Sequence, residues 1–248
     1  MDFFTLGESI PNITNPIGLF SHQHLFVLII LFLVGAYITK TYKLTEKKNA
    51  LKKTVANLIL LLEIARQITI LITGQYTWDY LPLHLCGLGV FIIFVDSRLE
   101  NSYTKELLFM LTFPGALAAL ITPDWAGNPL WNFFSLQSFI IHAFQITYVL
   151  MRYYAQEINP RLRKIWMPIV FLSVVLPFIA LVNSSLKTNF FFMTTGAPGS
   201  PLEALQNQFG NLYLPAAAAM VLIIWIAMYT ILGARRLLAK NVAFLRKG

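Results

Sequence analysis

The segment HLFVLIILFLVGAYITKTYKLTEKK, residues 24–48, decides the fold because a long apolar run ends in a cluster of lysines. The run from His24 to Thr41 approaches the roughly 20 mainly apolar residues that a helix needs to cross a bilayer. The lysines that follow are typical of a cytoplasmic loop. Because the same alternation recurs along the chain, the segment predicts a multi-pass membrane protein.

The composition favours the same class. Of 248 residues, 57% are hydrophobic and 12% are charged, about half the charged share of roughly a quarter in soluble domains. The net charge of +8 does not indicate nucleic-acid binding, because the basic residues lie in short connections between apolar blocks. Cys86 is the only cysteine, which excludes an internal disulfide. Residues 1–21 lack the pattern of a cleavable signal peptide, so the first spanning helix is expected to direct insertion.

We predict an all-α fold, a polytopic membrane bundle of about seven transmembrane helices that forms a single domain over residues 1–248. The helices are expected at residues 24–41, 55–74, 81–95, 105–121, 130–153, 165–186 and 213–233. Pro114 should bend the fourth helix, and Gly115 should allow close helix packing there. No internal repeat or long linker divides the chain.

The basic residues predict the orientation. Seventeen of the 19 Lys and Arg residues fall on one side of a seven-helix topology, Lys187 falls on the other side, and Arg66 lies within a helix. The positive-inside rule therefore places the N-terminus outside and the C-terminus in the cytoplasm. The longest outer loop, residues 186–212, is expected to be either a lid over an outward-facing site or a simple connector.

Three polar residues of the second predicted helix share one face. Glu63, Arg66 and Gln67 are spaced i, i+3 and i+4. Ionisable groups within the hydrocarbon cost about 2.5–3.5 kcal/mol by insertion scales, so they usually face the bundle interior. They indicate either an internal salt bridge or a site for a lipid head group or a substrate carboxylate.

The fifth predicted helix carries a polar stripe of Ser135, Ser138, His142 and Gln145. A histidine in a membrane helix is most often a hydrogen-bonded packing element. At the centre of a polar stripe it is also a candidate for proton transfer.

The third predicted helix opens with LPLHLC, residues 81–86, which contains His84 and Cys86. These two side chains point about 200° apart on a helix, so they are not expected to be partners. Counted from the helix ends, Cys86, His142 and Arg66 fall at compatible depths in the outer half of the membrane. A thiol beside an imidazole can become a thiolate nucleophile, and in lipid the obvious electrophile is an acyl ester.

These residues carry a family resemblance. The chain resembles the YwaF-type bacterial integral membrane proteins in SHQH at 21–24, in LPLHLC at 81–86, in His142 and in NFFFMTTGAPGSP at 189–201. That family is similar to a eukaryotic transmembrane phospholipid acyltransferase that uses a cysteine and a histidine. The resemblance implies Cys86 and His142 as the matching pair and a bacterial cytoplasmic membrane as the location. NFFF stands where an Asn-Tyr pair is expected, so Asn189 receives no role.

The leading hypothesis is a membrane acyltransferase or lipid-remodelling enzyme with membrane lipids as its partners. Cys86 would carry the acyl group and His142 would act as the base. The substrate-binding candidates are Arg66, His84, Glu63, Gln67, Gln145 and His24.

Two other hypotheses stay open. One is a small-solute or lipid transporter with Glu63, Arg66 and His142 along its pathway, and the other is a non-enzymatic membrane protein. A retinal protein is excluded because the last predicted helix has no lysine for a Schiff base. No metal and no cofactor are expected, since the four histidines are scattered, and the sequence leaves the oligomeric state open.

Overall fold

The computed structural model describes residues 3–7, 13 and 15–245, and it describes side chains up to residue 233. Its α-helices are α1 (His22–Leu44), α2 (Lys48–Ile72), α3 (Leu85–Leu99), α4 (Ser102–Leu107), α5 (Phe113–Ile121), α6 (Phe133–Tyr154), α7 (Trp166–Leu186), α8 (Pro201–Phe209) and α9 (Tyr213–Leu245). A π-helix, Leu108–Thr112, joins α4 to α5. Short 3₁₀-helices occur at Trp78–Tyr80, Leu162–Lys164, Phe190–Phe192 and Gly210–Leu212.

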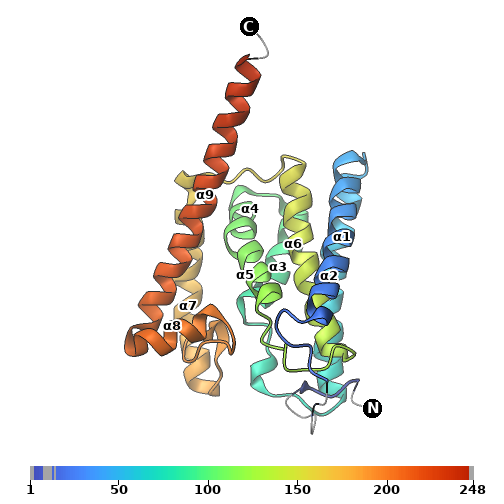
Figure 1. Ribbon diagram of the computed structural model, residues 1–248, viewed down its shortest axis with the longest axis vertical. Coiled ribbons are helices and arrows are strands. Elements are labelled where there is room, and N and C mark those ends of the chain that lie inside the picture. The colour runs from blue at the N-terminus through green and yellow to red at the C-terminus, as the bar shows by residue number, and fades with distance from the viewer. Residues whose placement is uncertain (1–2, 8–12, 14, 246–248) are drawn as a thin grey trace.

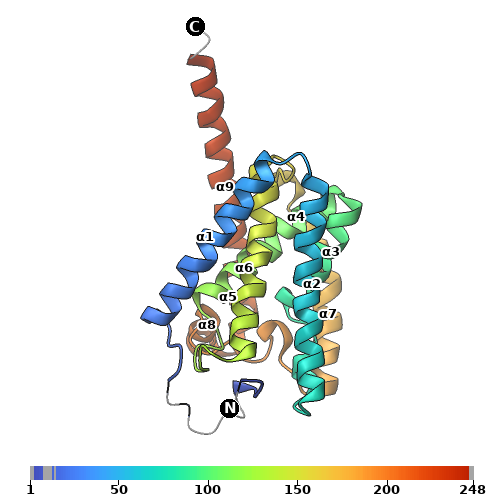
Figure 2. The ribbon, with the colours of Figure 1, turned by 90° about the vertical axis from the view of Figure 1, so that its right-hand side faces the viewer.

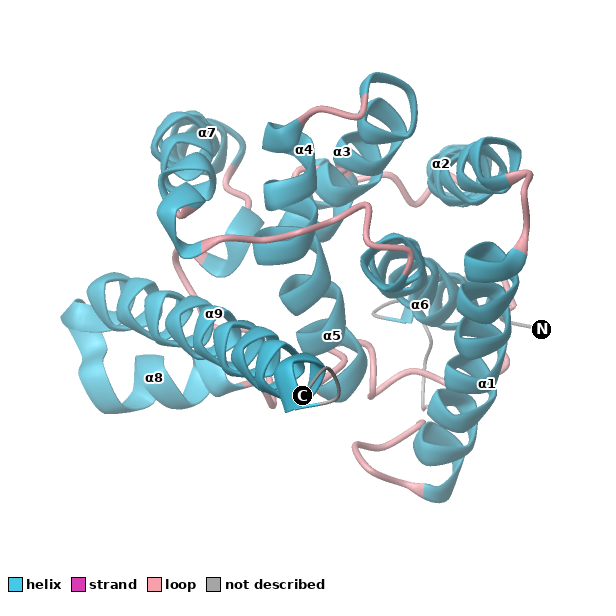
Figure 3. Ribbon diagram, turned by 90° about the horizontal axis from the view of Figure 1, so that it is seen from above, coloured by secondary structure: helices cyan, strands magenta, loops and turns pink. Residues whose placement is uncertain are grey.

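Helix α6 is the centre of the bundle. It packs against α1, α2, α3 and α5, whereas α7 reaches the rest mainly through α4. Seen along the bundle, α7, α8 and α9 all lie on the side away from α1, with α7 beside α4 and α8 beside α9 (Figure 3). The polar stripe predicted on α6 is thus surrounded by other helices.

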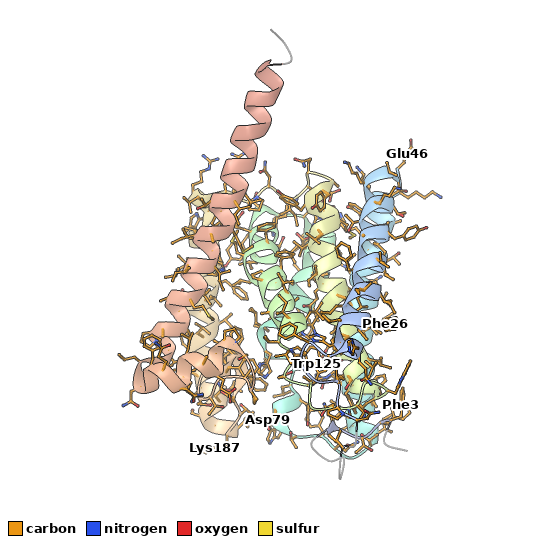
Figure 4. All side chains as sticks on the ribbon, viewed as in Figure 1. Phe3, Phe26, Glu46, Asp79, Trp125 and Lys187 are labelled. Atoms are coloured by element: carbon orange, nitrogen blue, oxygen red, sulfur yellow. The ribbon has the colours of Figure 1, made fainter. Side chains whose placement is uncertain are left out.

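The connections alternate between two ends of the bundle (Figure 1). Glu46, in the lysine-rich connection after α1, lies at one end, and Asp79 and Lys187 lie at the other (Figure 4). We call the first the basic end and the second the opposite end. Successive helices run back and forth between these ends, which is the alternation that the loop charges predict.

The prediction of an all-α membrane bundle is confirmed. Among the residues that the structure describes, six helical segments are long and apolar enough to cross a membrane: His22–Leu44, Lys48–Ile72, Ser102–Ile121, Phe133–Tyr154, Leu162–Leu186 and Pro201–Gly233. The remaining predicted helix, the third, corresponds to α3, which has only 15 residues. At about 1.5 Å per residue it is about 22 Å long, shorter than the hydrocarbon core of about 30 Å.

The predicted start of the third helix is wrong by four residues. Residues 81–84 are not helical, and α3 begins at Leu85. Residues 73–84 follow α2 as a turn, a 3₁₀-helix and irregular backbone (Figure 2). Backbone of this kind is tolerated at membrane depth only where protein or a water-filled cavity surrounds it. The LPLHLC segment is therefore part of the bundle interior.

Polar side chains define several helix starts. Ser21 caps α1 by accepting a hydrogen bond from the His24 N–H, and Asn132 caps α6 by accepting bonds from Phe134 and Ser135. Asn101 caps α4 in the same way. Side-chain caps satisfy N–H groups that have no partner within the helix. The start of α3 differs, because its N-cap residue His84 makes no side-chain capping bond.

The structure accommodates Pro114 by a π-helix rather than by the predicted simple bend. Proline has no N–H, so the Met110 carbonyl four residues earlier lacks its usual helical donor. The indole of Trp225 on α9 donates to that carbonyl at 2.6 Å. One turn away along both helices, the Tyr229 hydroxyl donates to Glu106 at 2.5 Å. These two bonds fasten α9 to the α4–π–α5 segment.

A charged cluster lies inside the bundle near the basic end. Arg152 and Asp96 are fully buried and form an ion pair, and the Arg152 Nε donates to Glu157 at 2.9 Å. The Tyr148 hydroxyl also donates to Asp96, and the Tyr42 hydroxyl donates to Glu157. Buried charges are tolerated when they are paired and hydrogen-bonded. This cluster therefore locks α1, α3 and α6 together.

Candidate functional site

The site is built around the first turn of α3. The Gln145 amide nitrogen on α6 donates to the carbonyl oxygen of Cys86 at 2.7 Å. Gln145 is the thirteenth residue of the 22-residue helix α6, about 18 Å from its start by helical rise. Cys86 therefore lies near the middle of the bundle, deeper than its place in the sequence predicts. Two residues of the predicted site are joined directly.

The Cys86 thiol points toward α5. A methyl group placed on Gly115 would lie 4.0 Å from the Cys86 sulfur and 3.0 Å from Leu85. Gly87 is equally restricted, since a Cβ there would lie 2.5 Å from the Pro82 carbonyl oxygen. The two glycines allow the irregular segment, the start of α3 and α5 to approach closely. The thiol is thereby held at a helix N-terminus, where the helix dipole favours negative charge.

His142 lies on the same side of α6, one turn from Gln145 toward the opposite end. Its Nδ1 is 2.6 Å from the Ser138 carbonyl oxygen, and its ring stacks on Trp125 with a centroid distance of 5.2 Å. A carbonyl can only accept, so Nδ1 carries a proton. In the neutral ring, Nε2 is then the basic nitrogen, which is the tautomer that general-base catalysis requires.

Glu63, Arg66 and Gln67 interact with one another and with the segment before α3. Arg66 is 3.6 Å from Glu63, and the Gln67 amide donates to Glu63 at 2.6 Å and to the Tyr80 carbonyl at 2.8 Å. The Arg66 side chain keeps 24% of its surface exposed. Its charge also interacts with both His84 and His142. The internal salt bridge is present, and the Arg66 guanidinium also lies over the Tyr80 ring. Among the described residues it makes no hydrogen bond, so its N–H groups can bind an anion.

His84 lies beneath the loop after α7. Its ring is 5.2 Å from Phe190 and 5.0 Å from Phe192 between centroids. Phe191 and Phe192 have positive φ angles of 59° and 52°, which bulky residues rarely adopt. The Asn183 side chain fixes the loop by accepting from the Phe190 N–H and donating to its carbonyl. The loop thus covers His84, the N-cap residue of α3.

His24 is placed differently from the other candidates. It is fully buried, its Nε2 lies 2.9 Å from the Leu120 carbonyl, and its Nδ1 accepts from the Phe20 N–H. Both ring nitrogens therefore have backbone partners, and the contact with Leu120 joins α1 to the end of α5. We assign His24 to packing and leave it out of the proposed site.

Besides Arg152 Nη2 in the charged cluster, four buried side-chain polar atoms have no hydrogen-bond partner among the described residues. They are Thr112 Oγ1, Gln145 Oε1, Ser135 Oγ and Trp125 Nε1. Most buried polar groups are paired, so an exception needs an explanation. The sequence alone does not single out Thr112 or Trp125 as site residues, because threonine and tryptophan are both common in and near membrane helices. Only the packing of the π-helix and the loop before α6 shows where they lie.

No arrangement of three or more His, Cys, Asp and Glu side chains suited to a metal ion occurs in the described part of the chain. Arg66 and Glu63 form an ion pair near the site. The carboxylate of Asp124 is close enough to Cys86 to interact with it electrostatically. The groups around Cys86 are suited to acid–base and nucleophilic chemistry.

Comparison with known proteins gives one match. The model of the TMEM164 family matches residues 19–229. The chain belongs to the TMEM164 family. No curated protein and no solved structure matches the chain. The matched region runs from α1 to α9 and includes every candidate site residue. The prediction of a membrane-protein family is confirmed, while the YwaF-type assignment and the similarity to an acyltransferase stay predictions.

Proposed function

We propose that this TMEM164-family protein is a membrane-embedded acyltransferase that moves a fatty acyl chain between lipids through a thioester on Cys86. One observation carries the proposal. Gln145 holds the backbone of Cys86 at the start of α3, one helical turn from a histidine whose Nδ1 is bonded to Ser138. Nucleophilic catalysis requires a nucleophile, a base beside it and a third group that orients the base. Cys86, His142 and the Ser138 carbonyl would take these roles.

In the first half-reaction, His142 Nε2 takes the thiol proton and the Cys86 sulfur attacks the ester carbonyl carbon of the donor lipid. The tetrahedral oxyanion is stabilised by the positive end of the α3 dipole and by first-turn N–H groups that no side chain caps. The carbon–oxygen bond then breaks. The leaving alkoxide receives the proton from His142, and the acyl group remains on sulfur as a thioester.

In the second half-reaction, His142 removes a proton from an acceptor hydroxyl, and that oxygen attacks the thioester carbonyl. The carbon–sulfur bond breaks, and the Cys86 thiolate regains the proton from His142. Each step transfers one acyl group and consumes no oxidant, reductant or nucleotide. Membrane lipids alone can therefore serve as donor and acceptor.

The free N–H groups of Arg66 support binding of the donor's phosphate, since guanidinium groups bind phosphate through several hydrogen bonds. Phe190 and Phe192 cover His84 and would shield the thioester from water. The basic loops support a cytoplasmic location of the basic end, with the donor entering from the membrane. The resemblance to YwaF-type proteins supports a bacterial cytoplasmic membrane.

The test uses purified full-length protein in lipid–detergent micelles with a phospholipid carrying an isotope-labelled acyl chain. Intact mass should increase by one acyl group, and hydroxylamine should remove it. Cys86→Ala should abolish the increase, and His142→Gln should slow it. His22→Gln is the matched control because His22 is exposed at the start of α1. An unmodified wild-type protein across phospholipid classes would contradict the proposal.

A further inference from the structure

Thr112 of the π-helix and Gln145 of α6 both approach Gly89 of α3. Gln145 is fully buried and Thr112 is 1% exposed, and Gln145 Oε1 and Thr112 Oγ1 have no hydrogen-bond partner in the described part of the chain. Leaving a buried polar atom without a hydrogen bond is unfavourable, because the atom loses its bonds to water and gains none in return. Two such atoms, on side chains that both approach Gly89, point to a polar ligand group.

Gly89 brings these two side chains together. A Cβ placed on Gly89 would lie 3.4 Å from Thr112 Oγ1 and 3.6 Å from Gln145 Nε2. Gly89 is three residues after Cys86 and therefore lies on nearly the same side of α3. The two side chains thus approach each other within about one helical turn of Cys86, between α3, the π-helix and α6.

The chemistry of the ligand follows from which atoms are free. The Cys86 carbonyl can only accept, so the nitrogen of the Gln145 amide must face it, and the free atom is the acceptor Oε1. Thr112 Oγ1 can both accept and donate. An uncharged hydroxyl, which has a proton to donate and lone pairs to accept, satisfies both atoms. A phosphate or carboxylate oxygen has no proton to offer Gln145 Oε1 and is disfavoured.

The position of Thr112 depends on the π-helix. The wider π turn includes Leu108–Thr112, and the Phe113 N–H bonds to the Leu108 carbonyl five residues earlier. Turns of this kind occur frequently at functional sites. Trp225 holds the turn in place by its bond to Met110. The Thr112 hydroxyl is therefore fixed by tertiary contacts.

We propose that Thr112 Oγ1 and Gln145 Oε1 form an uncharged hydroxyl-binding subsite that positions the acyl acceptor for attack on the Cys86 thioester. The inference rests on the proposed acyl transfer and specifies its second half-reaction. The acceptor is an uncharged hydroxyl compound, either a lysophospholipid, which gives a new ester, or water, which gives a free fatty acid. Thr112 and Gln145 are binding residues for that hydroxyl, and His142 removes its proton.

The experiment separates the two half-reactions. Full-length protein is first loaded with the labelled acyl group from a phospholipid and is then mixed with a lysophospholipid. The decay of acyl-Cys86 is followed by intact mass, and the labelled phospholipid and free fatty acid are quantified. New phospholipid identifies a lipid hydroxyl as the acceptor, whereas free fatty acid identifies water.

Thr112→Val should slow the decay of acyl-Cys86 about tenfold, which corresponds to the loss of one strong hydrogen bond. The rate at which Cys86 is acylated by the donor phospholipid should stay unchanged. Thr112→Ser should restore the rate because it keeps the hydroxyl. The matched control is Thr147→Val, since Thr147 is buried on α6 but its hydroxyl bonds to the Ala143 carbonyl. Thermal unfolding adds a second readout: Thr112→Val should not lower the midpoint, because it removes an unpaired polar atom.

The possible failures are distinguishable. If wild-type Cys86 never becomes acylated, the proposed function itself is wrong. If acyl-Cys86 forms and Thr112→Val transfers it at the wild-type rate, the hydroxyl subsite is wrong while the acyltransferase proposal stands. A Thr112→Val protein that is destabilised and slowed equally in both half-reactions would assign Thr112 to structure and overturn the subsite.

Discussion

The bundle contains two buried polar regions that differ in how their atoms are paired. In the charged cluster near the basic end, Asp96 and Arg152 are fully buried and are bonded to each other and to neighbouring side chains. Around Cys86 the groups are mostly neutral, and Thr112 and Gln145 each keep an oxygen that has no hydrogen-bond partner in the described part of the chain. In the charged cluster, Arg152 Nη2 also makes no hydrogen bond among the described residues, but it lies 3.9 Å from a carboxylate oxygen of Glu100, so its charge is balanced within the cluster. We therefore assign the first region to maintaining the fold and propose the second as the place where chemistry occurs.

The charged cluster should give the largest effect on stability. Arg152→Met leaves Asp96 and Glu157 without their cation, and breaking a buried ion pair in this way costs about 3–5 kcal/mol. Thermal unfolding in detergent micelles measures the loss. Arg163→Met is the control, because Arg163 is exposed at the same end. Equal stability of the two variants would show that the cluster does not hold the helices together.

A substitution at the proposed site around Cys86 should lower the rate of acylation and leave the stability of the fold nearly unchanged. His142→Gln removes the proposed base, and general acid–base catalysis contributes about 10²–10⁴-fold to rate. Acylation of Cys86 should therefore fall by at least about 10²-fold, whereas the unfolding midpoint should stay near that of the wild type. A variant that loses stability but retains acylation would reverse the distinction between the two regions.

The attachment of α9 should give an intermediate effect. Trp225→Phe leaves the Met110 carbonyl without a donor, at a cost of about 1–3 kcal/mol. Trp166→Phe is the control, because Trp166 is exposed at the start of α7. Unfolding of both variants in micelles gives the comparison. If Trp225→Phe also slows transfer from acyl-Cys86, the π-helix links α9 to the site.

The smallest effect is expected at the edge of the charged cluster. Tyr42→Phe removes the hydrogen bond from the Tyr42 hydroxyl to Glu157 and should lower stability by about 1 kcal/mol. Tyr37→Phe on the same helix is the control, since Tyr37 is exposed. No difference between the variants in unfolding would mean that Arg152 alone satisfies Glu157.

Much of the fold could be predicted because lipid imposes simple rules. Apolar length and the placement of Lys and Arg residues yield the number and direction of the passes. The start of α3 could not be predicted, because Leu81 to Leu85 reads as one apolar helix turn. Its irregular backbone is stabilised by contacts from outside the segment, such as the bond from Gln67 to the Tyr80 carbonyl.

The site was partly predictable for the same reason. Cys86, His142, Gln145 and Arg66 are conspicuous because reactive or polar groups are costly in apolar helices. Arg152 was counted only as a loop-proximal basic residue, yet its side chain turns inward to Asp96. Asp96 and Glu106 are acidic residues next to apolar runs, and the reasoning applied to Glu63 would have selected them. Thr112 has no such signal, since its importance comes from a missing partner.

The bond between Trp225 and the Met110 carbonyl has a consequence for how the protein is made. The two residues are 115 positions apart, so the ribosome delivers the donor long after the acceptor has entered the membrane. Until α9 is inserted, the Met110 carbonyl has no donor within its own helix, because Pro114 has no N–H. It must then accept a hydrogen bond from water or from another side chain. Insertion of α9 therefore removes this polar defect from the bilayer and completes the packing that α1 to α8 leave open.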